Sequence, residues 1–115
     1  MIPLKPEITI KDLEKLDIRV GTITEVTDIK ESDKLVVLDV DFGDFTRKII
    51  VGMKKERKDP TEVKGKQALF VVNLAPREMY GIVSQGMQFD IGYTNGIIPV
   101  LAMPEKPVPK GSCAG

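Results

Sequence analysis

Short runs in which apolar and polar residues alternate dominate this chain and predict β-strands. The clearest run is 34–42, where every second residue from 36 onward is apolar and aspartates stand between them. Successive side chains of a strand point to opposite faces, so this run buries one face and leaves the other more polar. Comparable apolar runs predict further strands at residues 17–29, 45–53, 67–74, 88–91 and 97–102. The spacing slips once after Gly21, which predicts a bulge or a bend in the first strand.

Turn and cap signals separate these runs. Gly43 and Asp44 predict a tight hairpin turn. Residues 94–96 (TNG) predict a second hairpin, because an Asn-Gly pair accepts positive φ at both positions. Thr9, followed three residues later by Asp12, predicts a capping box that starts a short helix ending near residue 17.

The number and length of these elements predict a small barrel. Strands in a closed barrel have no exposed edges, which favours closure over an open sheet. Among small barrels the OB-fold, a five-stranded Greek-key barrel, suits a chain of 115 residues. We therefore predict an all-β OB-fold with a short N-terminal helix and extra terminal β elements. One domain is expected over residues 1–115, with a core at about 10–102. The extended, Pro-rich tail at 103–115 either packs along the domain or sits at an interface.

Residues 73–87 (NLAPREMYGIVSQGM) form the segment with the most unusual composition. They follow an apolar run that reads as a buried strand, so they are expected to form a surface excursion. Turn formers and solvated side chains are enough for a loop. This segment also carries an amide, a guanidinium, a hydroxyl and a thioether side by side. That mixture favours recognition of something flat with a polar edge, such as an unstacked nucleotide.

Two absences narrow the chemistry. The chain has no histidine and a single cysteine, Cys113. Histidine acid–base catalysis, Ser-His or Cys-His nucleophiles and the usual zinc sites are therefore excluded. Carboxylate or lysine catalysis stays open in principle, but no paired-carboxylate, phosphate-binding or dinucleotide motif supports it, so we predict a non-catalytic protein without cofactor or metal. With no run of about 20 apolar residues and no signal peptide, a cytoplasmic protein without a membrane partner is expected.

The charge is balanced overall but uneven along the chain. Net charge is zero, yet residues 25–44 hold seven acids against two bases, and residues 45–66 hold eight bases against three acids. A basic segment is an electrostatic footprint for phosphate, but it is also typical of a solvated loop. Both interpretations stand at this point. A neutral chain is a poor general binder of nucleic acid, so an RNA partner would have to be recognised by its shape.

Several segments, taken in order, resemble one family. They are residues 16–21 (LDIRVG), 32–35 (SDKL), 38–43 (LDVDFG), 50–52 (IVG), 72–77 (VNLAPR), Gly81, 84–87 (SQGM), Pro107, Val108 and Gly111. The chain resembles the tRNA-binding domain family related to the endothelial-monocyte-activating polypeptide. Within that family it is most similar to the beta subunit or C-terminal domain of methionyl-tRNA synthetase and to small free-standing homologues. The resemblance runs from about residue 10 to residue 111.

The resemblance implies an OB-fold that binds tRNA by its structure and is not itself a catalyst. The module would raise tRNA affinity, with the methionyl-tRNA synthetase catalytic subunit as a possible partner. Free-standing members resemble homodimers joined through added N- and C-terminal elements. Two binding faces would help a neutral chain hold an anionic partner, because phosphate contacts add across the dimer.

Carried over by position, the resemblance implies a recognition cluster and a set of phosphate contacts. The cluster is Asn73, Arg77, Ser84 and Met87, and the phosphate contacts are Lys34, Lys54 and Lys55. An amide can both donate and accept at a base edge, and a guanidinium can bridge a phosphate or stack on a base. A hydroxyl is an adaptable partner, and a thioether is a soft apolar platform.

Each of these residues also has a purely structural interpretation. Met87 could belong to the core, Ser84 could cap a turn, and Asn73 could satisfy nearby backbone. An exposed Arg77 is harder to explain by packing. Tyr80 could stack on a base, although this position is not reliably aromatic in the family.

Three functions from different classes remain at the level of sequence. The first is the tRNA-binding module. The second is a CsaA-type export chaperone that binds unfolded peptides on the same barrel, although residues 75–77 (APR) and 84–87 (SQGM) favour tRNA. A cytokine-like or scaffold role is the third, and nothing in the sequence supports it.

Overall fold

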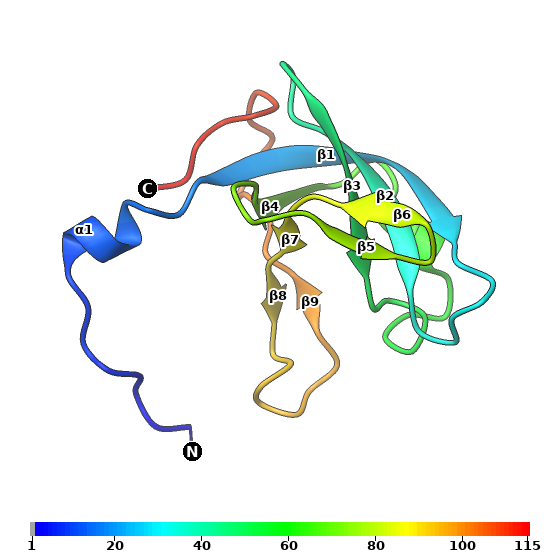
Figure 1. Cartoon of the computed structure of the whole chain (residues 1–115), viewed down its shortest axis with the longest axis horizontal. Helices are drawn as coiled ribbons and strands as arrows, with labels where there is room; N and C mark the ends of the chain where they lie inside the picture. Colours follow the sequence, from blue (N-terminus) through cyan, green and yellow to red (C-terminus); the bar gives the residue numbers. More distant parts are fainter. Residues whose placement is uncertain (1) are drawn as a thin grey trace.

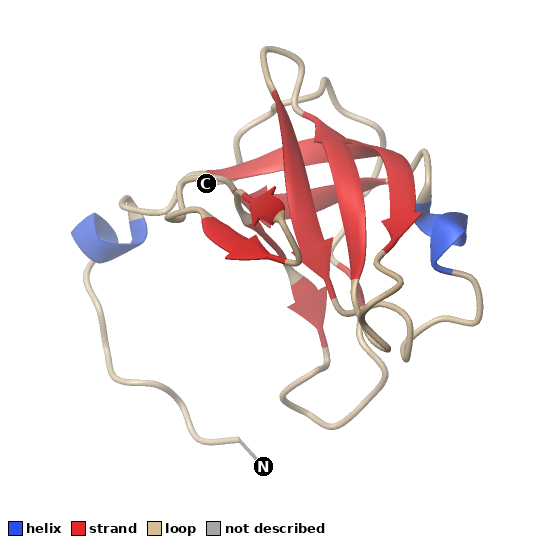
Figure 2. Ribbon diagram, turned by 45° about the vertical axis from the view of Figure 1, so that its right-hand side comes forward, coloured by secondary structure: helices blue, strands red, loops and turns tan. Residues whose placement is uncertain are grey.

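Five antiparallel strands form the barrel in the computed structural model, which describes residues 2–115 (Figure 1). Their order is β3-β2-β1-β4-β7. Their bounds are β1 Ile18–Asp28, β2 Val36–Asp41, β3 Thr46–Val51, β4 Gln67–Val71 and β7 Met87–Gln88. The sheet curls until β3 meets the segment that leads into β7, where the amide of Gln85 donates to the carbonyl of Lys48 at 2.9 Å (Figure 2). The predicted all-β, five-stranded OB-type barrel is thus confirmed.

Alternation along β2 builds the centre of the core, as the sequence predicts. Val36, Leu38 and Val40 are almost fully buried, and they belong to one core cluster with side chains from β1, β3 and β4. Phe42 continues the row and meets Phe70 of β4 edge to face, with ring centroids 5.6 Å apart. Burial of this apolar set, at roughly 25 cal/mol per Å², is the main driving force for folding.

β1 is long because it serves two partners. Ile18 to Thr22 pair with β4, and Thr22 to Asp28 pair with β2. A register shift between Ile23 and Glu25 places the bulge there, slightly beyond the predicted point. Gly21 has a different task, because a Cβ at this position would collide with Val40 and Phe42. The glycine therefore permits the close crossing of strands over the core.

The N-terminal helix begins as predicted and ends early. Thr9 and Asp12 form a reciprocal capping box, and α1 spans only Ile10–Leu13. Leu13, the last residue of the helix, and Leu16, just beyond it, are about half exposed. A short helix gains most of its stability from packing of an apolar face, and here the barrel does not provide it. The helix and the preceding arm project from the barrel (Figure 1). Neither α1 nor the 3-10 turn η1 (Pro60–Val63) is long and apolar enough to cross a membrane within residues 2–115.

The two predicted hairpin turns have different outcomes. Gly43 has a φ of 88°, and the amide of Phe42 donates to Phe45 at 2.9 Å, which confirms the tight turn after β2. The second hairpin joins β8 (Asp90–Ile91) to β9 (Val100–Leu101) through the longer connection 92–99. Gly96 adopts positive φ there, but Asn95 does not, so the two-residue Asn-Gly turn does not form. Both glycines of this loop, at 92 and 96, supply its reversals.

Residues 73–87 contain a hairpin of their own. β5 (Arg77–Met79) pairs with β6 (Ile82–Ser84), and Tyr80 and Gly81 make the turn with φ values of 54° and 75°. Positive φ at both positions is the signature of the turn type that matches strand twist. A tyrosine in this conformation is strained, because its Cβ crowds the backbone. The sequence predicts a surface excursion here but not its strands.

The C-terminal tail packs along the domain, which is one of its two expected arrangements. It runs beside the start of β1, where Val20 donates to Ser112 at 2.9 Å and Ala114 donates to Ile18 at 2.8 Å. The side-chain amide of Gln67 holds both backbone groups of Val108, at 2.8 and 3.0 Å. The tail therefore extends the sheet and covers the edge of β1.

Replacing Tyr80 by asparagine should stabilise the protein. Asparagine tolerates the left-handed backbone that strains tyrosine, and the tyrosine side chain is 54% exposed, so little burial is lost. We expect the free energy of unfolding in urea to rise by about 0.5–1 kcal/mol. Glu78→Asn, in the extended strand nearby, is the matched control and should bring no gain. A lower stability for Tyr80→Asn would contradict this account of the turn.

Candidate nucleic-acid interface

Two connections of the barrel carry four of the seven predicted site residues. Residues 29–35 join β1 to β2 and carry Lys34, and residues 72–86 join β4 to β7 and contain the β5–β6 hairpin. In OB-folds these two connections and the face of the second and third strands form the surface that binds oligonucleotides. The fold therefore presents the hairpin and Lys34 where such barrels bind their ligands.

The hairpin is anchored to β3 by Ser84. Its side chain is buried, and its hydroxyl oxygen accepts a hydrogen bond from the amide of Ile50 at 3.0 Å. Without that oxygen, the Ile50 amide would lose its partner in a partly buried place, at a cost of about 1–3 kcal/mol. Ser84 thus positions the hairpin, whatever else its hydroxyl contacts.

A hollow of about 400 Å³ lies between the hairpin and β3. Arg77 and Met87 both line it, and both side chains are exposed. Ser84 forms part of its floor, so the structure brings these predicted residues together. The complete lining is Ile50, Leu74, Ala75, Pro76, Arg77, Met79, Ser84, Gly86 and Met87.

Asn73 lies beside this hollow but is engaged elsewhere. Its Oδ1 accepts from the amide of Asp17 at 2.9 Å, and its Nδ2 donates to the carbonyl of Lys15 at 2.7 Å. The side-chain amide of Asn73 therefore holds the linker between α1 and β1 against the end of β4 by two hydrogen bonds. Recognition of a ligand by Asn73 would use the remaining hydrogen-bonding capacity of an exposed side chain.

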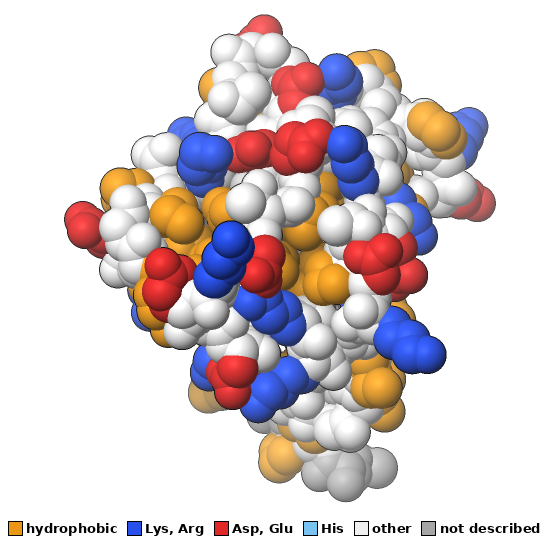
Figure 3. Space-filling view, turned by 90° about the vertical axis from the view of Figure 1, so that its right-hand side faces the viewer, with side chains coloured by type: hydrophobic (Ala, Val, Ile, Leu, Met, Phe, Trp, Pro, Cys, Tyr) orange, Lys and Arg blue, Asp and Glu red, His pale blue; other side chains and the backbone are white. Residues whose placement is uncertain are grey.

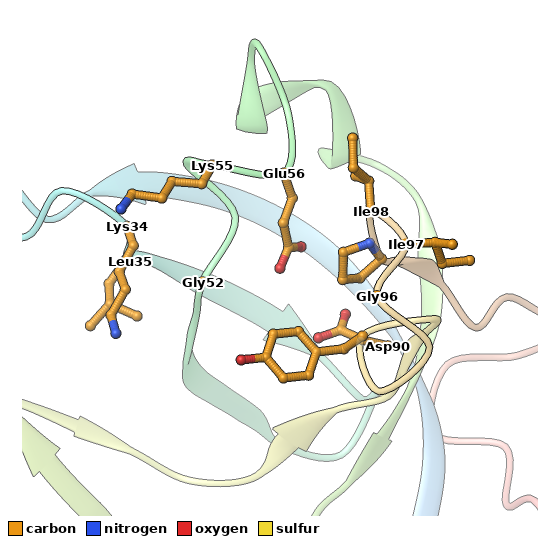
Figure 4. A pocket seen from close by; sticks show the side chains of 11 residues that line it. Lys34, Leu35, Gly52, Lys55, Glu56, Asp90, Gly96, Ile97 and Ile98 are labelled. Carbon is orange, nitrogen blue, oxygen red and sulfur yellow. The ribbon is translucent and has the colours of Figure 1, made fainter. Parts of the chain in front are cut away.

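The three predicted lysines have different surroundings. Lys54 donates to the carbonyls of Ile29 and Ser32 at 2.7 and 2.6 Å and forms an ion pair with Asp28. An ammonium group has three N–H donors, so this set leaves none for a phosphate. Lys34 and Lys55 instead line a second hollow, which the close view in Figure 4 shows.

The charge contrast along the sequence is largely cancelled by folding. Acids of the 25–44 segment and bases of the following segment lie on neighbouring elements and form ion pairs. These pairs are Glu25–Lys64, Asp28–Lys54, Asp33–Lys55 and Asp39–Lys48. The face in Figure 3 accordingly shows acidic and basic side chains intermixed. Among the predicted contacts, Arg77 and Lys34 form no ion pair with any of residues 2–115.

Sequence reasoning missed several residues of this surface. Arg47 and Lys48 line a further hollow on the other side of the hairpin, and Arg47 stacks 4.9 Å above the ring of Phe45. Both belong to the basic segment 45–66, which is the signal that the sequence offers for them. Glu56 and Asp90 line the hollow of Lys34, and they lie far apart in sequence. Burial raises the pKa of Glu56, and the negative charge of Asp90 raises it further.

Comparison with known proteins agrees with this geometry. The family described as "Putative tRNA binding domain" matches residues 18–112. A methionine–tRNA ligase from Bacteroides fragilis is 42% identical over 110 residues, which cover 96% of this chain. The chain spans only 16% of that relative's length.

Two solved structures with the same fold match nearly the whole of this chain. One is described as a MetRS-related protein from Pyrococcus horikoshii, with 31% identity and a TM-score of 0.87 over 96% of this chain and 100% of that one. The other is a CsaA chaperone protein from Picrophilus torridus, with 28% identity and a TM-score of 0.80 over 95% and 100% of the two chains. The family match covers most of the residues that the structure describes and confirms the predicted resemblance. The chain therefore belongs to the tRNA-binding domain family.

Proposed function

We propose that this chain binds tRNA by its folded shape, with the β5–β6 hairpin and the adjoining loops as the contact surface. The observation that carries the proposal is the hollow where Arg77, Ser84 and Met87 converge beside β3. It offers a charged group at the rim, an apolar platform and a fixed wall. Those are the features that a splayed nucleotide with its phosphate requires.

The electrostatics favour recognition of shape over general attraction. Most lysines near the site are neutralised by acids, and only a few charges, such as Arg77 and Lys34, stand unpaired within residues 2–115. The Lys55–Asp33 pair is long, at 3.7 Å, and highly exposed, so a phosphate can compete for that ammonium. A small number of phosphate contacts gives modest non-specific affinity.

The module is proposed to work in the cytoplasm by raising the tRNA affinity of methionyl-tRNA synthetase. It would do so as a C-terminal domain or as a separate beta subunit. The match to methionine–tRNA ligases over nearly the whole of this chain supports that role. The catalytic step would belong to the rest of the ligase and not to this chain.

A homodimer is the proposed assembly. The N-terminal arm, α1 and the linker to β1 carry a row of apolar side chains that are 43% to 100% exposed within residues 2–115. They are Ile2, Leu4, Ile8, Ile10, Leu13 and Leu16. A groove lined by Leu16, Ile18 and Leu69 lies beside the helix and provides an apolar surface of the same kind. A second copy of the chain would bury both and would double the number of RNA contacts.

The alternative function is a chaperone that binds unfolded peptides. The likeness to the CsaA protein from Picrophilus torridus supports it, and the exposed apolar side chains of the arm suit a peptide partner. The unpaired cations at the hairpin and at Lys34 favour RNA.

Removing the guanidinium should weaken tRNA binding. For Arg77→Ala we expect the affinity for unfractionated tRNA to fall about tenfold or more, because a bidentate contact is lost. Filter binding across a potassium chloride series measures this, and affinity should fall as salt rises, with a slope set by the number of phosphate contacts. Lys58→Ala, an exposed lysine outside the hairpin, is the matched control. Unchanged affinity for Arg77→Ala, or salt-insensitive binding of unfolded polypeptide with none of tRNA, would favour the chaperone.

Two neighbouring lysines should behave oppositely. Lys34→Ala should leave the fold stable and reduce the slope of log affinity against log salt by about one, the loss of one phosphate contact. Lys54→Met should lower the free energy of unfolding by about 2 kcal/mol or more, because it removes the donor for two carbonyls and Asp28. Thermal melting and the salt series together separate these roles, and a stable Lys54→Met variant with a reduced slope would reverse the assignment.

A charge placed on the arm should dissociate the proposed dimer. Leu4 is fully exposed within the chain, so Leu4→Asp costs no packing in the monomer. Light scattering should show a dimer for the native chain and a monomer for this variant, while Lys58→Glu, on a distant loop, should remain dimeric. A native monomer, or a dimer that survives Leu4→Asp, would argue against the arm as the interface.

A further inference from the structure

A larger hollow, of about 680 Å³, opens between the loop that follows β3 and the connection between β8 and β9. It adjoins the hairpin hollow, because Ile50 lines one and Gly52 the other. The β8–β9 connection lies outside the five-stranded barrel, so this cavity is an addition to the OB-fold surface described above. Its lining is Lys34, Leu35, Gly52, Lys55, Glu56, Asp90, Tyr93, Gly96, Ile97, Ile98 and Pro99.

Two carboxylates point into this hollow from different elements (Figure 4). Glu56 comes from the loop after β3 and Asp90 from β8. Within residues 2–115, no donor makes a hydrogen bond or ion pair with the Glu56 carboxylate, although the residue is partly buried. Asp90 is oriented by the buried side chain of Gln88, whose Nε2 donates to Oδ1 at 2.7 Å. The hollow therefore presents a Glu56 carboxylate without a donor and an Asp90 carboxylate of which one oxygen is already engaged.

The surrounding walls have a different character. Lys34 and Lys55 stand on one side of the hollow, and Ile97 and Ile98 stand on the other (Figure 4). Tyr93, also in the lining, is 76% exposed. An exposed aromatic ring beside branched apolar side chains is a platform on which a flat group can stack. The same hollow thus combines hydrogen-bond acceptors in its interior, cations on one side and an apolar platform on the other.

These features select the kind of guest. Its inner end must donate hydrogen bonds, its outer end must be anionic, and its body must be flat. A lysine or arginine of a peptide would satisfy the carboxylates but would bring its positive charge past two lysines. A divalent cation requires more ligands, and no group of three or more His, Cys, Asp or Glu side chains suited to a metal occurs within residues 2–115. A nucleotide meets all three requirements.

We propose that this hollow binds one unstacked guanine nucleotide of the tRNA, and the inference rests on the RNA-binding function proposed above. Guanine presents two adjacent donors, N1–H and the exocyclic amine, which one carboxylate accepts together. Adenine and cytosine offer a single amine on the same edge, and uracil offers only one ring N–H. The Glu56 carboxylate, both oxygens of which lack a donor within residues 2–115, accepts from the base edge, while Tyr93 stacks on the base and Lys34 and Lys55 face its phosphate.

The test uses the intact chain and single nucleotides as probes. Guanosine 5′-monophosphate should shift the NMR methyl signals of Ile97 and Ile98. Inosine 5′-monophosphate, which lacks only the exocyclic amine, should bind about tenfold more weakly, the effect of one hydrogen bond to a charged acceptor. Glu56→Gln should abolish that difference, because an amide offers one acceptor oxygen in place of two. Glu105→Gln, an exposed acid of the tail, should preserve it.

A stability measurement separates binding from folding. Glu56→Gln removes a partly buried charge that has no partner in residues 2–115, so its melting temperature should equal or exceed that of the native chain. Equal affinity for the guanosine and inosine nucleotides would overturn the proposal. So would shifts produced only by a lysine-rich peptide, or only by raising the protein concentration, which would mean a peptide or a second copy in the hollow.

Binding of whole tRNA is measured in parallel. If tRNA binds and depends on Arg77 while the guanosine preference is absent, this inference fails and the proposed function stands. If the guanosine preference is present but tRNA does not bind, the proposed function fails, and with it the assignment of the guest to tRNA.

Discussion

Closure of the barrel between β3 and residues 84–88 is the constraint on which the site depends. The Ser84 hydroxyl accepts a hydrogen bond from the Ile50 amide, and the Gln85 amide donates one to the Lys48 carbonyl. Because β2 pairs with the other edge, β3 has hydrogen-bonding partners on both of its edges. The same hydrogen bonds fix the root of the β5–β6 hairpin. As a result Arg77 and Met87 stand beside a rigid strand and not on a mobile loop, which is how a scaffold holds a binding constellation in place.

Charge in this protein is used sparingly. The acidic and basic halves of the 25–66 region fold against each other, so the surface carries little net field. Exposed pairs of this kind add little stability, but they remove the general attraction for polyanions that unpaired lysines would cause. The few cations that remain unpaired then determine where the phosphates of a partner must lie. A neutral module with few well-placed charges is suited to a partner whose fold fixes its phosphates, and tRNA is such a partner.

The sequence predicts those features that depend on neighbours along the chain. Alternation gives β2, the capping box gives the start of α1, and Gly43 gives the first hairpin turn. The Tyr80–Gly81 turn is missed, because tyrosine is strained in a backbone that Asn or Gly accepts readily. The early end of α1 is missed as well, since only the three-dimensional structure shows that the barrel leaves Leu13 and Leu16 uncovered.

The site residues also divide into those that a local sequence pattern indicates and those whose role depends on distant contacts. The composition of residues 73–87 is enough to indicate the hairpin hollow, because its lining comes mostly from one segment. The role of Lys54 depends on carbonyls more than twenty residues away, and that of Asn73 on partners at separations of 56 and 58 residues. Glu56 and Asp90 likewise line one hollow only because the fold places β8 near the loop after β3. No local pattern encodes such contacts.

Mapping the tRNA footprint on the folded chain tests the central claim most directly. Amide signals of the isotope-labelled protein would be followed by NMR as unfractionated tRNA is added. The account predicts that perturbed signals concentrate at residues 34, 55–56 and 74–87, while those of η1 and the tail at 103–109 stay unchanged. Perturbations confined to the N-terminal arm, or none with tRNA and many with an unfolded polypeptide, would contradict it.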